Sequence, residues 1–234
     1  MKIILVTRSA NSTLYLKSLD TTSSFPYERI REKHFKGGQE AALRYLLNLF
    51  EYDVDWVVNI DEDAFVFDPD RILKLIEYMD QFGYDFCGMP DGGVTRERKH
   101  NPIIPNAFFN IFRVSKIKIN RSTILKQDFR NDLFKFLPEK LIKEGFDYTW
   151  NVKEKYYCLF FWLLRVGYKC LYLNGYDHSD GISTILQDHE GQDFLIHTWC
   201  ARTYEVEVGQ NQRIDEAYHY CLERKLQVIS KQKV

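Results

Sequence analysis

The 234-residue sequence lacks several features that would each define a class of protein. Its formal net charge is only -1, and its basic residues are spread along the chain, which argues against a partner held by charge, such as a nucleic acid. No apolar run approaches the roughly 20 residues that a membrane span needs. We therefore expect no nucleic-acid partner and no transmembrane segment, with at most peripheral contact with a membrane.

Cysteine is also scarce. The five cysteines are odd in number and widely spaced and include no C-x-x-C pair, which argues against a disulfide framework. Buried free thiols are typical of a reducing compartment, so we expect a cytoplasmic protein. The apolar run of residues 3–6 is too short for a signal peptide and is interrupted by Arg8, so it predicts a first strand instead. A chain of this length can bury the core of one large domain without disulfides.

The most informative stretch runs from residue 55 to residue 70. Residues 56–60 form a short apolar, β-branched run that is typical of a buried parallel strand, and it ends abruptly on Asp61, Glu62 and Asp63. In open α/β sheets, ligands bind at the carboxyl ends of the strands. Hard oxygen ligands at that edge suit Mg²⁺ or Mn²⁺ holding a diphosphate.

An acidic triplet behind an apolar strand resembles the DxD motif of GT-A type nucleotide-sugar glycosyltransferases. The resemblance implies an α/β fold of the GT-A, Rossmann-like kind, with a mostly parallel central sheet flanked by helices, in one domain that spans residues 1–234. It also implies that Asp63 binds a divalent metal, Mn²⁺ or Mg²⁺, and that Asp61 contacts the metal or the ribose of the donor. Without the strand, a D-x-D triplet is as easily explained as a solvated turn.

The end of the first strand is a second candidate region. The resemblance implies that Thr7, Arg8 and Ser9 contact the base, ribose or pyrophosphate of the donor, and the charge of Arg8 suits a phosphate. The alternative is that Arg8 only solvates a strand end. Farther along, the polar loop of residues 90–102 is long and charged enough to form a lid over a substrate or to be disordered.

Amides interrupt the next strand-like run, residues 103–114. The resemblance implies that Asn106 and Asn110 face the donor sugar, and hydrogen bonding to neighbouring backbone is the structural alternative. Residues 121–145 have a helical pattern that is broken at Pro138.

A helix is predicted over residues 154–166, where apolar residues repeat at i, i+3, i+4 and i+7. The resemblance places the general base at its start, which points to Glu154, with Asp147 in reserve. An acid in the first turn of a helix also interacts favourably with the helix dipole, which is the structural alternative for Glu154.

A histidine follows the last predicted strand. The resemblance implies that His197 completes the metal site, with His178 and His189 as rivals. A lone histidine after an apolar pair is otherwise a core residue whose polar atoms are satisfied. The chain closes with a helix over residues 214–226.

Together these features predict a metal-dependent transferase of the hexosyltransferase type, with a role in polysaccharide synthesis. It would move a sugar from a nucleotide-diphosphate donor, with a UDP-sugar favoured, to a hydroxyl of a glycan, lipid-linked or other acceptor. The alternatives are a nucleotidyltransferase, which lacks support from a glycine-rich basic first loop, and a non-catalytic carbohydrate- or cation-binding protein. A phosphatase of the DxD kind needs Thr or Ser soon after the motif, where residues 64–66 are Ala, Phe and Val.

Overall fold

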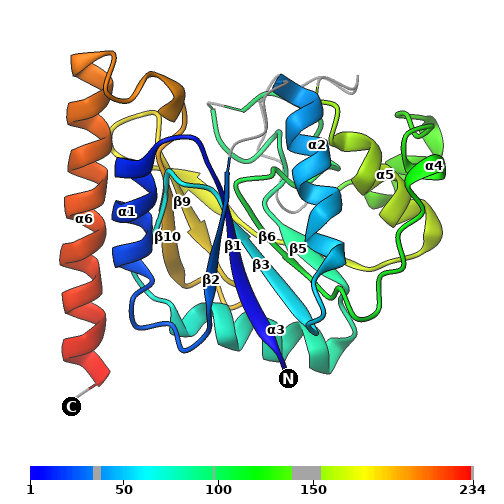
Figure 1. The fold of residues 1–234 in the computed structure, drawn as a ribbon, viewed down its shortest axis with the longest axis horizontal. Coiled ribbons are helices and arrows are strands. Elements are labelled where there is room, and N and C mark those ends of the chain that lie inside the picture. The colour runs from blue at the N-terminus through cyan, green and yellow to red at the C-terminus, as the bar shows by residue number, and fades with distance from the viewer. Residues whose placement is uncertain (34–37, 97, 139–153, 233–234) are drawn as a thin grey trace.

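The computed structural model describes residues 1–33, 38–96, 98–138 and 154–232 (Figure 1). Within them the chain forms two β-sheets flanked by helices. The strands of the larger sheet are β1 (Ile3–Ser9), β2 (Arg29–Lys33), β3 (Trp56–Ile60), β5 (Phe86–Gly88), β6 (Phe109–Phe112) and β7 (Cys170–Tyr172). The smaller sheet contains β4 (Ala64–Val66), β8 (Gly175–Asp177), β9 (Thr184–Gln187) and β10 (Asp193–His197).

The larger sheet has the strand order β2-β1-β3-β6-β5-β7. Strand β1 runs parallel to β2 and β3, and β5 runs parallel to β7, whereas β6 lies antiparallel to both of its neighbours. The sheet is therefore mixed and mostly parallel. Every residue of β3 is buried, as the apolar run before the acidic triplet predicts.

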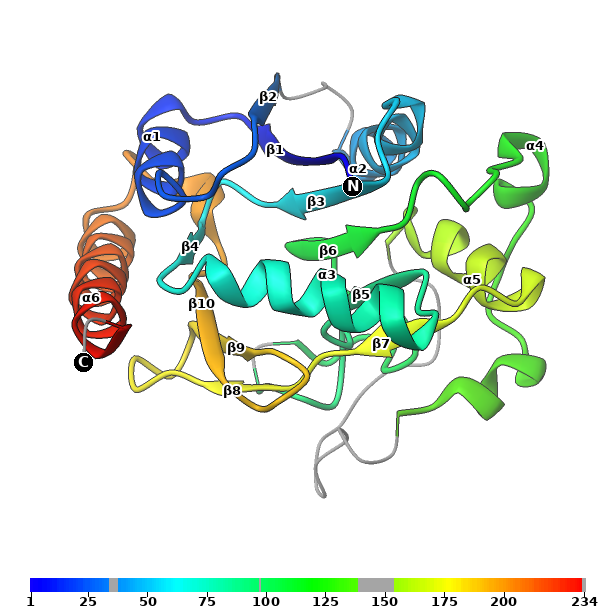
Figure 2. The ribbon, with the colours of Figure 1, turned by 90° about the horizontal axis from the view of Figure 1, so that it is seen from below.

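Helices cover both faces of this sheet. One face is covered by α2 (Gly38–Asn48) and α5 (Tyr157–Val166), whose aliphatic and aromatic side chains share one core cluster with β3 and β6. On the other face, α3 (Asp70–Phe82) packs with Ile72, Leu75, Ile76 and Met79 against the sheet and against β10 (Figure 2). The α/β fold class with a flanked, mostly parallel sheet is thus confirmed.

The smaller sheet is antiparallel, in the order β4-β10-β9-β8. Two helices that lie side by side, α1 (Ser12–Thr21) and α6 (Val208–Gln232), cover it at one end of the molecule (Figure 1). Their contact with the sheet forms a third core cluster, which includes Leu14, Phe65, Ile196 and Ile214.

Several helix boundaries differ from the sequence-based expectation. Helix α3 ends at Phe82, and the C-cap that follows, Gly83, adopts a left-handed φ of 72°. Pro69 takes the N-cap position of α3, and no side chain caps the helix. The helix expected from residue 154 begins at Tyr157. The closing helix is longer than expected, because it begins at Val208 rather than near residue 214.

The region expected to be helical from residue 121 contains short elements instead. These are α4 (Arg121–Ile124) and a 3-10 helix at Asn131–Phe136. Residues 139–153 lie outside the described part of the chain. None of the helices within the described residues is long and apolar enough to cross a bilayer.

A candidate metal centre at the junction of the two sheets

The acidic triplet forms the turn at which the chain leaves the larger sheet and enters the smaller one. Asp61 follows β3 directly, and its backbone N–H donates to the carbonyl of Phe108 at 2.8 Å. Ala64 then opens β4, where it pairs with His197 at the end of β10. Because β10 returns antiparallel to β4, a histidine far along the chain arrives beside the triplet.

Three ligand atoms converge there, one each from Asp61, Asp63 and His197, and all lie within 4.8 Å of one another. The Nε2 atom of His197 lies 3.3 Å from Oδ1 of Asp63. Both of these side chains are buried, whereas Asp61 is partly exposed. The His197 ring stacks on Phe108, with ring centroids 4.2 Å apart, and packs edge-on against Trp199 at 4.1 Å. The imidazole therefore sits in a tight aromatic slot.

The two carboxylates differ in their electrostatic surroundings. Burial raises the pKa of Asp61, and the charge of Asp63 adds to this, although the Arg8 guanidinium 3.7 Å away opposes both. Burial would also raise the pKa of Asp63, but the charge of His197 and its hydrogen bond outweigh burial and lower it. Two carboxylates therefore lie close together beside one imidazole, and a bound cation would reduce the repulsion between their charges.

The residues at this junction fit a divalent metal. The Nε2 atom of His197 faces Asp63, and within the described chain its buried Nδ1 atom has no hydrogen-bond partner. Two carboxylates with one imidazole form a donor set that suits Mn²⁺ or Mg²⁺. The rival histidines lie elsewhere: His178 is 3.5 Å from Asp180, and His189 stacks on Tyr78.

The middle acid of the triplet points away from the cluster. The carboxylate of Glu62 accepts a hydrogen bond from the backbone N–H of Asn11 at 2.8 Å, and burial raises its pKa. Glu62 therefore ties the triplet to the start of α1.

The end of β1 lies next to the triplet, and its side chains alternate in direction as strand geometry requires. Arg8 points toward Asp61 and lies over the ring of Tyr45. Thr7 is fully buried, and its hydroxyl accepts two hydrogen bonds from Arg29, at 2.8 and 2.9 Å. The hydroxyl of Ser9 accepts a hydrogen bond from Arg31 at 3.1 Å. Contact of these three residues with a nucleotide stays a prediction.

A buried polar network, which the sequence did not reveal, lies beyond the triplet. Asp91 is completely buried, and its two oxygens accept hydrogen bonds from Nε and Nη2 of Arg98 at 2.7 and 2.9 Å. It also accepts hydrogen bonds from Asn106, Tyr156 and Tyr157. Burial would raise the pKa of Asp91, but the charge of Arg98 and hydrogen bonds from His100, Arg98 and Tyr157 lower it well below its usual range.

Asn106 is engaged within the protein on both sides of its amide. Its nitrogen donates to Asp91, and its oxygen accepts from the backbone N–H of Phe108 at 3.0 Å. Asn110 also bonds locally, because its nitrogen donates to the Asn106 carbonyl at 3.0 Å. These bonds match the structural alternative for both amides, and contact of Asn106 with a donor sugar stays a prediction.

Arg98 connects the network to the candidate metal centre. Its guanidinium lies over the ring of Trp199, 5.3 Å from the centroid, and that ring packs on His197. Arg98 also lies 3.8 Å from Glu154, the predicted base, which precedes α5. The reserve candidate, Asp147, falls outside the described residues. In its described part, the loop of residues 90–102, the expected lid, is therefore held in place by the contacts of Arg98 and Asp91.

A surface cavity of about 570 Å³ lies away from this cluster. It is lined by Asp68, which precedes α3, and by residues of α3, β8, the β9–β10 hairpin and α6, including Arg71, Asp193 and Arg224. Asp193 begins β10 and His197 ends it, so the cavity and the candidate metal centre lie at opposite ends of one strand. We place the candidate site at the triplet because the metal-ligating groups converge there.

No protein-family model matches this chain, and no curated protein matches it significantly. Among solved structures it is distantly similar to A197 from STIV, with 15% identity, a TM-score of 0.38, and coverage of 83% of this chain and 94% of that one. It also matches the mannosyltransferase PcManGT from Pyrobaculum calidifontis, solved with GDP-Man and Mn²⁺, at 12% identity and a TM-score of 0.33, over 48% of this chain and 44% of that one. A third match is S. aureus TarS 1-349 with UDP-GlcNAc, at 12% identity and a TM-score of 0.34, over 49% of this chain and 46% of that one.

Proposed function

We propose that this chain is a metal-dependent glycosyltransferase. It transfers a sugar from a nucleotide-diphosphate donor, with a UDP-sugar favoured, to a hydroxyl of a glycan, lipid-linked or other acceptor. The observation that carries the proposal is the convergence of Asp61, Asp63 and His197 at the carboxyl end of β3. Strand ends of this kind are where α/β sheets bind ligands.

In this proposal Asp61, Asp63 and His197 hold Mn²⁺ or Mg²⁺. The bound ion supplies Lewis-acid stabilisation of the negative charge that develops on a departing diphosphate. Arg8 favours an anion at the same place, because its guanidinium lies 3.7 Å from Asp61 and remains 22% exposed. Thr7 and Ser9 complete the donor edge of β1.

Glu154 is the proposed general base for the acceptor hydroxyl. Its side chain is 23% exposed and lies 3.8 Å from Arg98, so its carboxylate faces both the solvent and the loop of residues 90–102. A transferase that inverts the anomeric centre needs such a base, whereas one that retains it does not. Asp147 remains the reserve for this role.

The proposal treats residues 1–234 as one domain of the GT-A kind that works in the cytoplasm, with peripheral membrane contact if its acceptor is lipid-linked. The competing functions are a nucleotidyltransferase and a non-catalytic carbohydrate- or cation-binding protein. Binding of a nucleoside diphosphate that requires manganese separates the proposed transferase from the non-catalytic alternative.

Calorimetric titration of UDP and GDP, with and without Mn²⁺, tests the proposal. We expect binding in the presence of Mn²⁺ to wild type, and loss of at least tenfold in affinity in Asp63→Asn, which removes one negative ligand. Asp70→Asn is the matched control, because Asp70 is exposed at the start of α3. No binding of either nucleotide to wild type would overturn the proposed use of UDP- or GDP-sugars and leave a cation site.

A further inference from the structure

Two arginines of α6 hold the two ends of β10. Arg213, in the second turn of the helix, donates to the backbone carbonyls of Thr198 and Trp199, which follow the strand. Arg224 forms an ion pair at 3.4 Å with Asp193, which begins the strand. Eleven helical residues rise by about 16 Å, and five extended residues span about 17 Å. The helix and the strand are therefore matched in length between these contacts.

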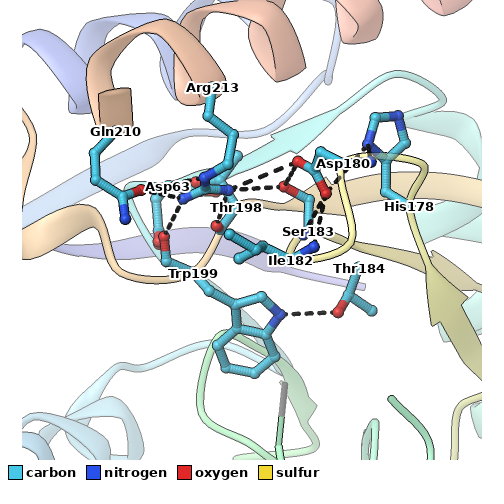
Figure 3. Close-up of polar contacts among 10 residues, drawn as sticks. All are labelled: Asp63, His178, Asp180, Ile182, Ser183, Thr184, Thr198, Trp199, Gln210 and Arg213. Carbon is cyan, nitrogen blue, oxygen red and sulfur yellow. Dashed lines mark hydrogen bonds and ion pairs between the residues drawn. The ribbon is translucent and has the colours of Figure 1, made fainter. Parts of the chain in front are cut away.

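All five N–H groups of Arg213 are used within the protein (Figure 3). Nη1 donates to the Ser183 hydroxyl at 3.0 Å and to the Thr198 carbonyl, and Nη2 donates to the Trp199 carbonyl at 2.9 Å. Nε and Nη2 both donate to the side-chain oxygen of Gln210. The side chain is only 11% exposed. Arg213 is thus saturated by internal acceptors and has no N–H left for a substrate.

The two carbonyls that Arg213 holds belong to the residues that support the candidate metal ligands. Both the N–H and the hydroxyl of Thr198 donate to the Asp63 carbonyl, at 3.1 and 3.2 Å. The Trp199 ring packs on His197, and its indole N–H donates to Thr184 at 2.8 Å. The guanidinium of Arg213 therefore bonds to the same residue, Thr198, that bonds to the Asp63 carbonyl (Figure 3), and to Trp199, whose ring packs on His197.

The turn that Arg213 holds has an unfavourable backbone. Trp199 and Cys200 adopt left-handed φ angles of 53° and 57°, although neither is glycine. Such conformations persist only when their surroundings fix them. The bonds from Arg213 to the carbonyls of Thr198 and Trp199 supply that fixation from outside the turn.

We propose that Arg213 is a positioning residue of the metal centre, an inference that rests on the metal site of the proposed function. It holds the Thr198–Trp199 turn in the conformation that brings Asp63 and His197 together. Arg224, its counterpart on the same helix, fixes only the far end of β10. If Arg213 has a purely structural role, replacing either arginine should change Mn²⁺ affinity by the same amount. If Arg213 positions the metal ligands, only its replacement should lower that affinity.

The test compares Arg213→Met with Arg224→Met in calorimetric titrations of Mn²⁺ and in thermal unfolding. We expect both variants to melt at lower temperature, because each loses an anchor between α6 and the sheet. Mn²⁺ affinity should fall by about 10- to 100-fold only in Arg213→Met, the loss that is typical of residues that orient metal ligands. Affinities within twofold of each other in the two variants would overturn the inference. If Arg213→Met does not fold, Arg213→Lys against Arg224→Lys makes the same comparison.

A second measurement separates failure of this inference from failure of the proposed function. The indole N–H signal of Trp199 in a metal-free ¹H–¹⁵N spectrum, assigned with Trp199→Phe, should shift in Arg213→Met and stay in place in Arg224→Met. If wild type binds no Mn²⁺ but this shift occurs, the proposed metal centre fails and the positioning of the turn stands. If wild type binds Mn²⁺ and the signal does not move, Arg213 does not position the turn.

Discussion

Replacing Asp91 by asparagine would test whether the buried network beside the candidate metal centre stabilises the fold. Asp91 is completely buried, and both of its oxygens accept hydrogen bonds from Arg98, which is 20% exposed. Asparagine has nearly the same shape but carries no charge and only one accepting oxygen. The substitution therefore removes the closer of the two carboxylates beside the largely buried guanidinium of Arg98 and leaves only Glu154, at 3.8 Å.

The expected cost follows from this geometry. Breaking a buried ion pair by removing one partner costs about 3–5 kcal/mol. Because asparagine keeps one acceptor, we expect Asp91→Asn to lie at the lower end, near 3 kcal/mol. For a chain of this size, each kcal/mol lowers Tm by about 2–4 °C, so Tm should fall by about 6–12 °C.

The cost should also depend on pH with a definite sign. Burial opposes ionisation of Asp91, but Arg98 and the surrounding hydrogen bonds outweigh burial and lower its pKa in the folded state. A carboxylate whose pKa falls on folding stabilises the fold above its unfolded pKa of about 3.9. That contribution is lost as the pH falls toward the folded pKa. The difference in free energy of unfolding between wild type and Asp91→Asn should therefore be largest near neutral pH and decrease below about pH 4.

Urea unfolding of wild type and Asp91→Asn across this pH range measures the effect. Asp132→Asn is the matched control, because Asp132 binds Arg165 through the same pair of nitrogens, both at 2.9 Å, but is 49% exposed. An exposed pair of this kind contributes only about 0–1 kcal/mol. If Asp91→Asn costs no more than Asp132→Asn, the reasoning from burial is wrong.

Two further substitutions give sharp outcomes. Gly92→Ala should destabilise the protein by about 1–3 kcal/mol in urea unfolding, because the Cβ of the alanine would lie 1.9 Å from the backbone oxygen of His100. Gly209→Ala in α6 is the control. The space around Gly209 is open, so this substitution should not destabilise the protein. Glu154→Gln should lower kcat by about 10²–10⁴ if Glu154 is the general base, while calorimetric binding of Mn²⁺ and nucleotide stays unchanged. An unchanged kcat would rule out this base.

The sequence predicted well the elements in which buried apolar residues form a recognisable pattern along the chain. The helix predicted from residue 154 repeats Tyr157, Phe160, Phe161 and Leu164 at i, i+3, i+4 and i+7, all of them buried, and Gly167 follows it as the C-cap. Strand β3 could be recognised because it is buried on both faces. In these places the local pattern and the tertiary environment agree.

Strands with little local signal were missed. Strand β2 reads RIREK, which is charged at most positions because it pairs on one side only, at the edge of the larger sheet. Strands β4, β8 and β9 are three or four residues long, too short for a period to be evident. Of the run expected over residues 103–114, only Phe109–Phe112 is a strand, since Asn106 bonds to the neighbouring backbone instead.

The sequence likewise identified only part of the candidate site. The triplet and His197 could be selected because each follows a predicted strand. Asp91, Arg98 and Trp199 could not be selected, because a proline-aspartate-glycine sequence and scattered cations are also typical of ordinary loops. Their roles arise from long-range packing, which depends on how β10 and the loop of residues 90–102 meet.

The pairing of β4 with β10 has a consequence for how the protein folds. It joins residues far apart in sequence, since the bond from Thr198 to Asp63 closes a separation of 135 positions. Contacts of such long range cost the most chain entropy to form and are expected late in folding. A cation that binds only the assembled cluster favours the folded chain by mass action, about 2.7 kcal/mol at a concentration 100 times its Kd. A bound cation at the candidate cluster would then add to the stability of the smaller sheet.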